Sequence, residues 1–207
     1  LSNPNPRVGC VICKGDKILG QGYTQRVGSH HAEIEAIANA HHQGASNSDL
    51  NGCTVYVSLE PCSHIGRTPP CCDALEQIRP ARVVIAMQDP NPKVAGQGIA
   101  RLQKLGIDVK VGLLAKESAE LNPGFIKRMT QGLPFVRMKI AASFDGRTAL
   151  ANGQSQWITG VAARADGHHW RAQACAILSG GGTVREDDPQ LTVRDVMTER
   201  QPLRVIV

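Results

Sequence analysis

The chain has 207 residues, 42% of them apolar and 20% charged, which allows one large domain or two smaller ones, each with a hydrophobic core. No apolar stretch approaches the roughly 18 residues of a membrane span, which argues against a membrane protein. The basic residues behind the net charge of +5 are scattered and aromatic residues make up only 3%, so a small anionic substrate is favoured over nucleic acid. The seven cysteines, an odd number, favour thiol or metal chemistry in a reducing, cytoplasmic compartment over disulfide bonds.

The first half of the sequence alternates between strand and helix patterns. Alternating apolar residues predict strands, and apolar residues spaced by three and four predict helices. The expected strands lie at 7–12, 18–22, 54–58, 83–86 and 109–111, and the expected helices run from Ala32 to about His41, from 72 to 78 and from 99 to 105. Strands that alternate with helices indicate a layered α/β sheet.

A charged helical segment at 117–132 separates this half from the rest of the chain. Beyond it, a run of three glycines at 180–182 is more typical of a turn than of a phosphate-binding loop. The remaining patterns predict strands at 135–140, 174–178 and 203–207 and a helix at 162–172, which is short for a complete domain. We therefore expect a first domain at 1–116, a connector at 117–132 and the start of an incomplete second domain at 133–207.

A histidine and three cysteines form a candidate metal site in the first half. His31 stands at the start of a helix with Glu33 two residues on, and Cys62, Cys71 and Cys72 follow a strand about thirty residues later. A catalytic zinc uses three nitrogen or sulfur ligands and leaves the fourth position for water, which one histidine and two cysteines satisfy. Glu33 can carry protons for that water, and a cysteine at a helix N-terminus is stabilised as the thiolate.

Each of these residues also has a simpler interpretation. An isolated histidine before a helix is often a cap or a surface residue, a glutamate in the first turn is favoured by the helix dipole, and free cysteines are often small buried apolar groups. The joint occurrence of His-x-Glu, Pro-Cys and a further cysteine at a helix start favours the metal site. Cys10 and Cys13 are a weaker candidate pair, because residues three apart on a strand face opposite sides.

The motifs resemble a known family. His31-Ala32-Glu33 followed by Pro61-Cys62 and another cysteine is similar to the signature of zinc-dependent cytidine-deaminase-like proteins. The usual Cys-x-x-Cys spacing is longer here, because the eight residues 63–70 separate Cys62 from Cys71. That loop, together with NPNPRVG at 3–9 and QDPNPKVAG at 88–96, closely resembles the bifunctional riboflavin-biosynthesis deaminase/reductase family of bacteria over essentially the whole chain.

For the first domain, the resemblance implies a cytidine-deaminase-like α/β/α sandwich with a zinc site. The family's ligands fall on His31, Cys62 and Cys71, which would hold Zn²⁺, whereas Cys72 becomes a neighbour that does not bind the metal. Glu33 would then shuttle protons while an activated water attacks a ring carbon that bears an amino group, and ammonia is released.

Three further residues are candidates for substrate binding in this domain. Asn5, His64 and Arg67 are expected to hold a pyrimidine and its phosphoribosyl arm. The guanidinium of Arg67 suits a phosphate, because it offers a planar fork of donors. The alternative for all three residues is a surface turn.

For the second half, the resemblance implies part of a dihydrofolate-reductase-like α/β domain that uses NADPH. A hydride would go to the open-chain form of the sugar. The family's cofactor contacts fall on Ala141, Trp157, Thr183 and Asp187, and its substrate contacts fall on Ser155, Arg171, Leu191 and Arg194. Because the family's reductase domain continues well past residue 207, reductase activity of this piece alone is not expected.

Taken together, the resemblance implies two consecutive reactions of riboflavin biosynthesis. The first is hydrolytic deamination of 2,5-diamino-6-(5-phosphoribosylamino)pyrimidin-4-one, and the second is NADPH-dependent reduction of the ribosyl chain of 5-amino-6-(5-phosphoribosylamino)uracil. We expect a cytoplasmic homo-oligomer that binds a small phosphoribosylated pyrimidine, and neither nucleic acid nor a membrane.

Two other functions are consistent with parts of the pattern. A deaminase of nucleosides or of bases in nucleic acid would share the metal site but have the short Cys-x-x-Cys loop and an aromatic or basic path. A binding module with structural zinc would have a closed site of four ligands, with Cys72 or His64 as the fourth and Glu33 dispensable.

Overall fold

A computed structural model describes residues 2–92, 94–198 and 200–207, and it divides into two compact units, Ser2–Phe135 and Val136–Val207. By their contacts, the helices at 117–132 lie within the first of these units. The assignment of a deaminase domain, a connector and a reductase domain to 1–116, 117–132 and 133–207 stays a prediction. Among the described residues, no helix has both the length and the apolar character that crossing a bilayer requires.

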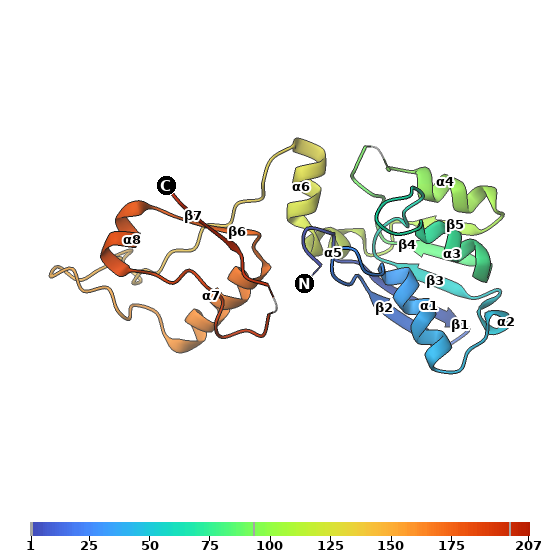
Figure 1. Ribbon diagram of the computed structural model, residues 1–207, viewed down its shortest axis with the longest axis horizontal. Coiled ribbons are helices and arrows are strands. Elements are labelled where there is room, and N and C mark those ends of the chain that lie inside the picture. The colour runs from blue at the N-terminus through green and yellow to red at the C-terminus, as the bar shows by residue number, and fades with distance from the viewer. Residues whose placement is uncertain (1, 93, 199) are drawn as a thin grey trace. The chain divides into compact units, whose positions relative to one another are not determined.

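The first unit is built on a mixed five-stranded sheet, in the order β2-β1-β3-β4-β5 (Figure 1). Strand β1 is antiparallel to both of its neighbours, whereas β3, β4 and β5 are parallel to one another. The layered α/β fold expected from the sequence is confirmed. The strands are β1 (Gly9–Lys14), β2 (Lys17–Tyr23), β3 (Thr54–Val57), β4 (Arg82–Ile85) and β5 (Asp108–Val111).

Helices α1, α3 and α4 form a contiguous layer on this sheet: α1 packs on β1 and β2, α3 contacts both α1 and α4, and α4 contacts β5 (Figure 1). The core between the layers includes Ile12, Val55 and Val83 from the strands and Leu75 and Leu102 from the helices, all buried. The helices of this unit are α1 (Ala32–His42), α2 (Asn47–Leu50), α3 (Cys71–Ile78), α4 (Gln97–Lys104), α5 (Ala115–Leu121) and α6 (Pro123–Gln131).

Two glycines let α1 lie directly on strand β2. A Cβ atom at Gly20 would be 2.3 Å from the carbonyl oxygen of Ala36, and one at Gly22 would be 2.4 Å from the nitrogen of Ala36. These separations are far below a van der Waals contact, so neither position has room for a side chain. The close approach fixes the height of α1 over the sheet, and with it the position of His31 and Glu33.

Helix α5 and the residue that follows it are hydrogen-bonded to residues next to β3 and β1. The hydroxyl of Ser118 donates to the carbonyl of Ser58, directly after β3. The side chain of Asn122 accepts from the main-chain N–H of Arg7 and donates to its carbonyl, both at 2.7 Å. The segment expected as a connector therefore also fixes the N-terminal residues before β1.

In the second unit, α7 (Val161–Gln173) and α8 (Gly181–Asp187) accompany a parallel pair of strands, β6 (Ala176–Ser179) and β7 (Leu203–Ile206). The strand expected at 135–140 is wrong, since this segment has no regular structure. Its alternating side chains, such as Val136 and Met138, are exposed, so the apolar alternation has no packed face to satisfy.

The turn expected at the glycine run is also wrong. Gly181 begins α8, and the carbonyl of Gly180 accepts the first helical hydrogen bond, from the N–H of Val184 at 3.2 Å. Glycine has a poor intrinsic preference for helix, and here the residues after the run, which form the rest of the helix, override it.

Candidate metal centre

Three side chains from separate elements meet in the first unit. His31 precedes α1, Cys62 follows β3, and Cys71 is the first residue of α3. The Nδ1 atom of His31 lies 3.6 Å from the sulfur of Cys62 and 3.3 Å from that of Cys71. One ligand atom from each residue lies within 4.8 Å of the other two, which forms a compact donor set.

The local backbone explains how these side chains come together. His31 occupies the N-cap position of α1 in an extended conformation, but its side chain makes no capping hydrogen bond. Helix capping therefore does not explain why a histidine stands here. The N–H of Cys71 donates to the sulfur of Cys62 at 3.2 Å, and the N–H of Cys72 donates to the carbonyl of Cys62 at 3.1 Å. The start of α3 therefore fixes Cys62 beside Cys71.

The sulfurs of Cys62 and Cys71 differ in proton affinity, which is low at Cys62 and high at Cys71. A hydrogen bond from the thiol of Cys71, together with His31, lowers the pKa of Cys62 to about 4 although the side chain is largely buried. The same hydrogen bond and burial raise the pKa of Cys71. The pair therefore holds one proton between its sulfurs, which a cation displaces when it binds, because metals bind the thiolate form.

The donor set fits zinc. Tetrahedral zinc with bonds of about 2.3 Å to sulfur and about 2.0 Å to nitrogen places its nitrogen and sulfur ligands about 3.5 Å apart. The two nitrogen–sulfur distances at His31, 3.3 and 3.6 Å, bracket this value. One imidazole and two thiolates leave the fourth position open, which is the ligand count of a catalytic site.

Glu33 lies beside this cluster on the first turn of α1 and is only 4% exposed. Burial raises the pKa of its carboxyl group, while a hydrogen bond with the thiol of Cys71 acts in the opposite direction. A buried carboxyl group in contact with a metal ligand, and outside the donor set, is suited to hold and release a proton.

The remaining cysteines lie elsewhere. The sulfur of Cys72 faces the carbonyls of Pro61 and Gly98, at 3.7 and 3.9 Å, rather than the cluster. Cys10 is buried in the core of the sheet and Cys13 is half-buried. None of the seven cysteines, each within the described residues, forms a disulfide bond.

Of the residues predicted to bind the deaminase substrate, two lie in the loop between the cysteine ligands and one lies before β1. His64 and Arg67 are exposed in the loop between the two cysteine ligands, and Asn5 is half-buried in a turn where its N–H donates to the carbonyl of Ser2. His64 also interacts electrostatically with Asp89, whose pKa is raised by burial. Their roles in binding stay predictions.

Sequence reasoning missed Glu60, a buried carboxylate two residues before Cys62. Its signal in the sequence was an acidic residue between a buried strand and the Pro-Cys pair, which is unusual because buried acidic residues need dedicated partners. Here the partners are four main-chain N–H groups.

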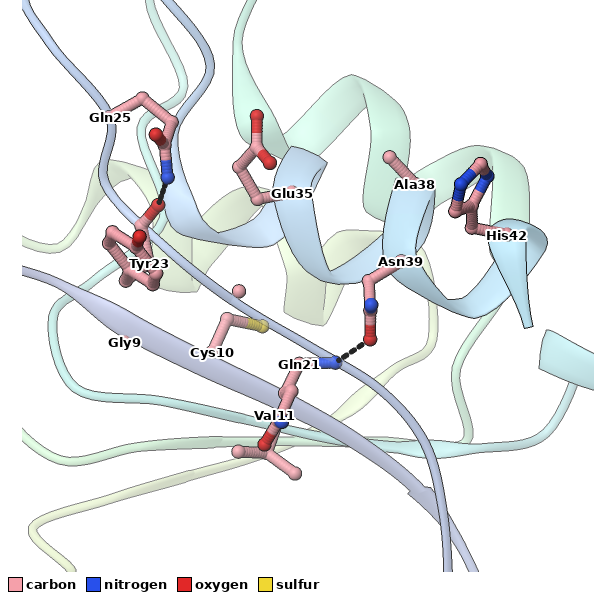
Figure 2. A pocket seen from close by; sticks show the side chains of 11 residues that line it. Gly9, Cys10, Val11, Gln21, Tyr23, Gln25, Glu35, Ala38, Asn39 and His42 are labelled. Carbon is pink, nitrogen blue, oxygen red and sulfur yellow. Dashed lines mark hydrogen bonds between the residues drawn. The ribbon is translucent and has the colours of Figure 1, made fainter.

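A separate hollow of about 880 Å³ is lined by residues of β1, β2 and α1 (Figure 2). Tyr23, Glu35 and His42 contribute to its lining, and the side-chain oxygen of Asn39 accepts from the N–H of Gln21 at 3.0 Å. None of the three cluster residues lines it, so the metal centre and this hollow are distinct.

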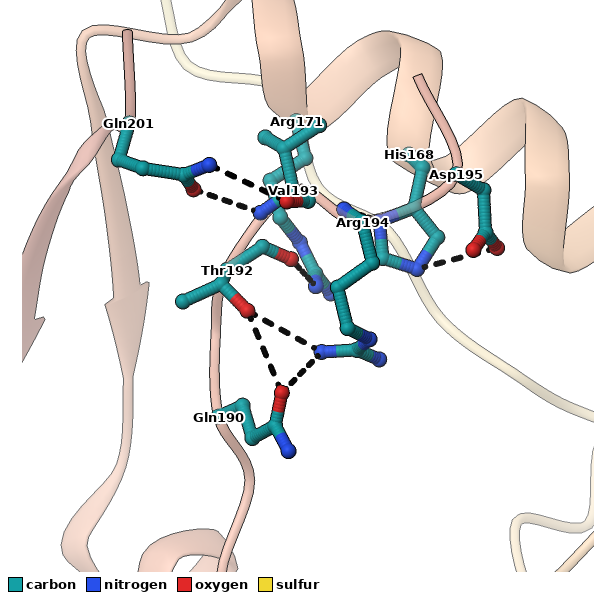
Figure 3. Close-up of polar contacts among 8 residues, drawn as sticks. All are labelled: His168, Arg171, Gln190, Thr192, Val193, Arg194, Asp195 and Gln201. Carbon is teal, nitrogen blue, oxygen red and sulfur yellow. Dashed lines mark hydrogen bonds and ion pairs between the residues drawn. The ribbon is translucent and has the colours of Figure 1, made fainter. Parts of the chain in front are cut away.

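In the second unit, two predicted substrate residues lie together (Figure 3). Burial lowers the pKa of Arg171, and the positive charge of Arg194 lowers it further. The guanidinium of Arg171 donates to the carbonyl of Thr192 at 2.7 Å, and that of Arg194 donates to the side chain of Gln190 at 3.1 Å. Leu191 adopts a left-handed conformation, with φ of 54°, in the same segment. Two adjacent cationic groups suit an anionic ligand.

Sequence reasoning also missed His168, which supports this segment from α7. Its side chain is buried, its Nδ1 atom accepts from the N–H of Arg194 at 3.3 Å, and its Nε2 atom lies 3.5 Å from the carboxylate of Asp195 (Figure 3). Burial and the neighbouring arginines lower the pKa of His168.

The predicted cofactor residues lie on α8 and in irregular segments of the second unit. Thr183 and Asp187 are exposed and four residues apart on α8, which puts them on one side of that helix. The exposed ring of Trp157 lies 4.5 Å from the guanidinium of Arg164, and Ala141 is half-buried in an irregular segment, as is the predicted substrate residue Ser155. Their roles stay predictions.

Comparison with protein families gives the class of each half. Residues 2–87 match the family model described as the zinc-binding region of cytidine and deoxycytidylate deaminases. Residues 134–207 match the model described as the RibD C-terminal domain. The two matches fall on the metal centre and on the segment that holds Arg171 and Arg194.

Individual relatives cover the whole chain. It is 52% identical, over 218 aligned residues, to the riboflavin biosynthesis protein RibD of Escherichia coli K12, and 45% identical over 206 residues to that of Aquifex aeolicus. All of this chain is matched in both comparisons, but only 58% and 56% of the relatives. The chain thus spans a little over half the length of the curated relatives it matches.

Solved structures agree with this picture. One form of Acinetobacter baumannii RibD superposes with a TM-score of 0.91 at 48% identity, and a diaminohydroxyphosphoribosylaminopyrimidine deaminase/5-amino-6-(5-phosphoribosylamino)uracil reductase from Thermotoga maritima with 0.91 at 43%. Each match covers 99% of this chain and 57% of the solved one. The chain therefore has a cytidine-deaminase-like fold followed by a region that resembles the RibD reductase part.

Proposed function

We propose that the first domain is a zinc-dependent pyrimidine deaminase of riboflavin biosynthesis, acting on 2,5-diamino-6-(5-phosphoribosylamino)pyrimidin-4-one. The observation that carries the proposal is the cluster of His31, Cys62 and Cys71 with the buried Glu33 beside it. It is supported by 52% identity to a riboflavin biosynthesis protein along the whole chain. We further infer that the protein is a cytoplasmic homo-oligomer and that it binds this small molecule as its substrate.

His31, Cys62 and Cys71 would hold the zinc, which supplies a water molecule with its pKa lowered to about 7. The chain's own contribution to the reaction is the proton traffic. Glu33 accepts a proton from the attacking water and passes it to the ring nitrogen. It then takes the second proton from the hydroxyl group added to the ring carbon and passes it to the amino group, which leaves as ammonia. Burial of its carboxyl group favours the protonated form, which suits the second task.

The alternative of a structural zinc has less support. It needs a fourth protein ligand, but the sulfur of Cys72 faces two carbonyls and His64 is exposed. A nucleoside or nucleic-acid base deaminase shares the donor set. The loop 63–70, with Arg67 exposed in it, favours a phosphorylated substrate over a nucleoside.

For the second domain, we propose binding of the deaminated product, with reduction of its ribosyl chain in the longer protein. Arg171 and Arg194, with Ser155 and Leu191, would hold the phosphorylated sugar. NADPH, the expected hydride donor, would contact Ala141, Trp157, Thr183 and Asp187. In the described structure, the exposed Trp157 ring and the Thr183–Asp187 side of α8 are compatible with such contacts.

Ammonia release tests the deaminase proposal. The zinc-loaded protein is offered the diamino-pyrimidinone ribosyl phosphate, cytidine and adenosine, and release is expected from the first alone. Glu33→Gln should reduce the rate by a factor of about 100 to 10,000 while zinc is retained, because the proton carrier is removed and the ligands are not. The matched control is Glu35→Gln on the same helix, which should leave the rate unchanged. Release from no substrate by zinc-loaded protein would contradict the proposal.

A further inference from the structure

Glu60 occupies an unusual position in the first unit. Its carboxylate is almost completely buried, at 4% exposure, and accepts four main-chain N–H groups. One oxygen accepts from Gly98 at 2.8 Å and from Ile99 at 3.1 Å. The other accepts from Asp89 at 3.1 Å and from Gly96 at 3.0 Å. Both oxygens are thus used, each by two donors.

These donors belong to two places in the chain. Gly98 and Ile99 are in the first turn of α4, where N–H groups have no partner within the helix. The N-cap residue, Gly96, has a left-handed backbone with φ of 80° and no side chain to cap the helix. Glu60 supplies that cap from a distant position, and its second oxygen ties down Asp89, which follows β4.

The backbone that leads to the metal ligand Cys62 is packed against the same helix start. A Cβ atom at Gly98 would lie 2.1 Å from the carbonyl oxygen of Pro61, so α4 approaches as closely as a glycine allows. The N–H of Glu60 donates to the carbonyl of Met87 at 3.0 Å, which fixes this segment to the end of β4 as well.

The residues tied down by Glu60 adjoin the metal centre. We call residues 89–92 and 94–96 the wall segment. The carboxyl group of Asp89 interacts electrostatically with Cys62 and with His64 in the loop 63–70. The oxygen Oδ1 of Asp89 accepts from the N–H of Asn91 at 2.8 Å, which orders the turn that follows.

We propose that Glu60 is a positioning residue for the deamination. It holds the wall segment at a fixed distance from the loop 63–70 and in this way governs substrate binding. The inference rests on the proposed function of this site. Within the described residues, the hydrogen bonds of the Glu60 carboxylate come from main-chain N–H groups of the wall segment and of α4. Its effect should therefore fall on the binding of substrate rather than on the chemical step.

Glu60→Gln separates the two tethers. A glutamine has nearly the same volume, but its amide nitrogen is a donor and cannot accept the two N–H groups that one carboxylate oxygen accepts. The oxygen that remains should still accept from Gly98 and Ile99, because α4 packs closely against Pro61. The N–H groups of Asp89 and Gly96 should then lose their hydrogen bonds to residue 60.

The experiment combines hydrogen exchange with steady-state kinetics on zinc-loaded protein. In Glu60→Gln, exchange of the amides of Asp89 and Gly96 should accelerate at least about tenfold, and KM should rise by about tenfold, the equivalent of one hydrogen bond to a charged group. Zinc content and kcat should be nearly unchanged. Glu117→Gln, an exposed glutamate on α5, is the control and should change none of these quantities.

Three outcomes would overturn the proposal: unchanged exchange at both amides, a fall in kcat at constant KM, or loss of zinc. If Glu60→Gln does not fold, the same readouts on Glu60→Asp decide, since that variant keeps both acceptor oxygens but shortens the tether, and faster exchange with a raised KM is expected. If the wild-type protein releases no ammonia, the proposed deamination is wrong, whereas the exchange rates still test the tether.

Discussion

The adjacent cysteines at the start of α3 have different surroundings that spacing alone does not distinguish. Pro70 is the N-cap residue, so Cys71 takes the first helical position and faces His31, while Cys72 turns into the interior. A one-residue change in the start of the helix would exchange the two roles. The sequence therefore predicts a pair of cysteine ligands, but the choice between Cys71 and Cys72 came from the family resemblance.

We predict that Cys62→Ala abolishes zinc binding and that Cys72→Ala does not. Removal of Cys62 takes away the sulfur with the lowered pKa, whereas Cys72 contributes packing and weak thiol hydrogen bonds to two carbonyls, so its loss should cost about 1 kcal/mol of stability. Metal analysis after dialysis and urea unfolding measure the two quantities. Equal loss of zinc in both variants would contradict the assignment.

Buried polar residues that support the site from a distance are the hardest to predict. Glu60 and His168 accept hydrogen bonds from main-chain groups that are 26 or more residues away in sequence. Such partners leave no local pattern, because they depend on how the elements pack. His31 and Cys62 could be found because each lies in a short motif.

His168 predicts a pH dependence of stability in the second unit. Burial, Arg171 and Arg194 lower its pKa and Asp195 opposes this, so the folded form binds a proton less readily than the unfolded chain. The stabilisation is complete above the unfolded pKa of about 6.5 and is lost as the pH falls below it. Between pH 7.5 and 5.5, unfolding of the wild-type chain should shift to lower denaturant concentration.

The matched variant for this prediction is His168→Asn, whose side-chain oxygen can replace Nδ1 as the acceptor for the N–H of Arg194. It does not titrate in this range, so its unfolding midpoint should depend much less on pH. An equal shift in both proteins would show that other groups cause the dependence. Denaturant unfolding followed by tryptophan fluorescence measures the midpoint, since both Trp157 and Trp170 lie in the second unit and Trp170 is in the same helix as His168.

At the scale of elements, the strands and helices of the first unit could be predicted to within a few residues. They pack on one another, so their apolar positions repeat with a regular period. Two errors lie at 135–140, where the apolar alternation is exposed, and at 180–182, where the glycines lead into a helix. The four-residue helix α2 was not expected, since it is shorter than the period that reveals a helix.

The contact of α1 with β2 predicts a large effect of a single methyl group. Gly20→Ala should destabilise the first unit by about 1 to 3 kcal/mol, because the added Cβ overlaps the main chain of Ala36. Gly9→Ala, on β1 with nothing within 4 Å of the added atom, is the control and should have little effect. Urea unfolding of both variants measures the difference, and similar midpoints would contradict the packing.

At the scale of the whole molecule, the apolar core is unevenly distributed. The buried core cluster lies between Cys10 and Ile107, within the first unit. In the described residues of 136–207, the buried apolar side chains are those of Ala172, Val193 and Pro202. The first unit therefore has the burial that independent folding requires, and the second unit has little of it.

We predict that a chain ending at Phe135 folds cooperatively, binds one zinc ion and keeps the proposed deamination. The core cluster and the residues around the metal all lie before that point. Circular dichroism, metal analysis and ammonia release test it. The complementary piece, 136–207, should show no cooperative unfolding by itself. An insoluble or zinc-free 1–135 chain would show that the first unit depends on the second.

The two hydrogen bonds that join Cys62 to the start of α3 have a consequence for how such a site can diversify. They fix both ends of the loop 63–70, so the positions of the ligands do not depend on the residues between them. Each doubling of a flexible loop costs only about 0.6 kcal/mol of closure entropy. Insertions between the two cysteines can therefore create new substrate specificity while the metal-binding geometry is inherited unchanged.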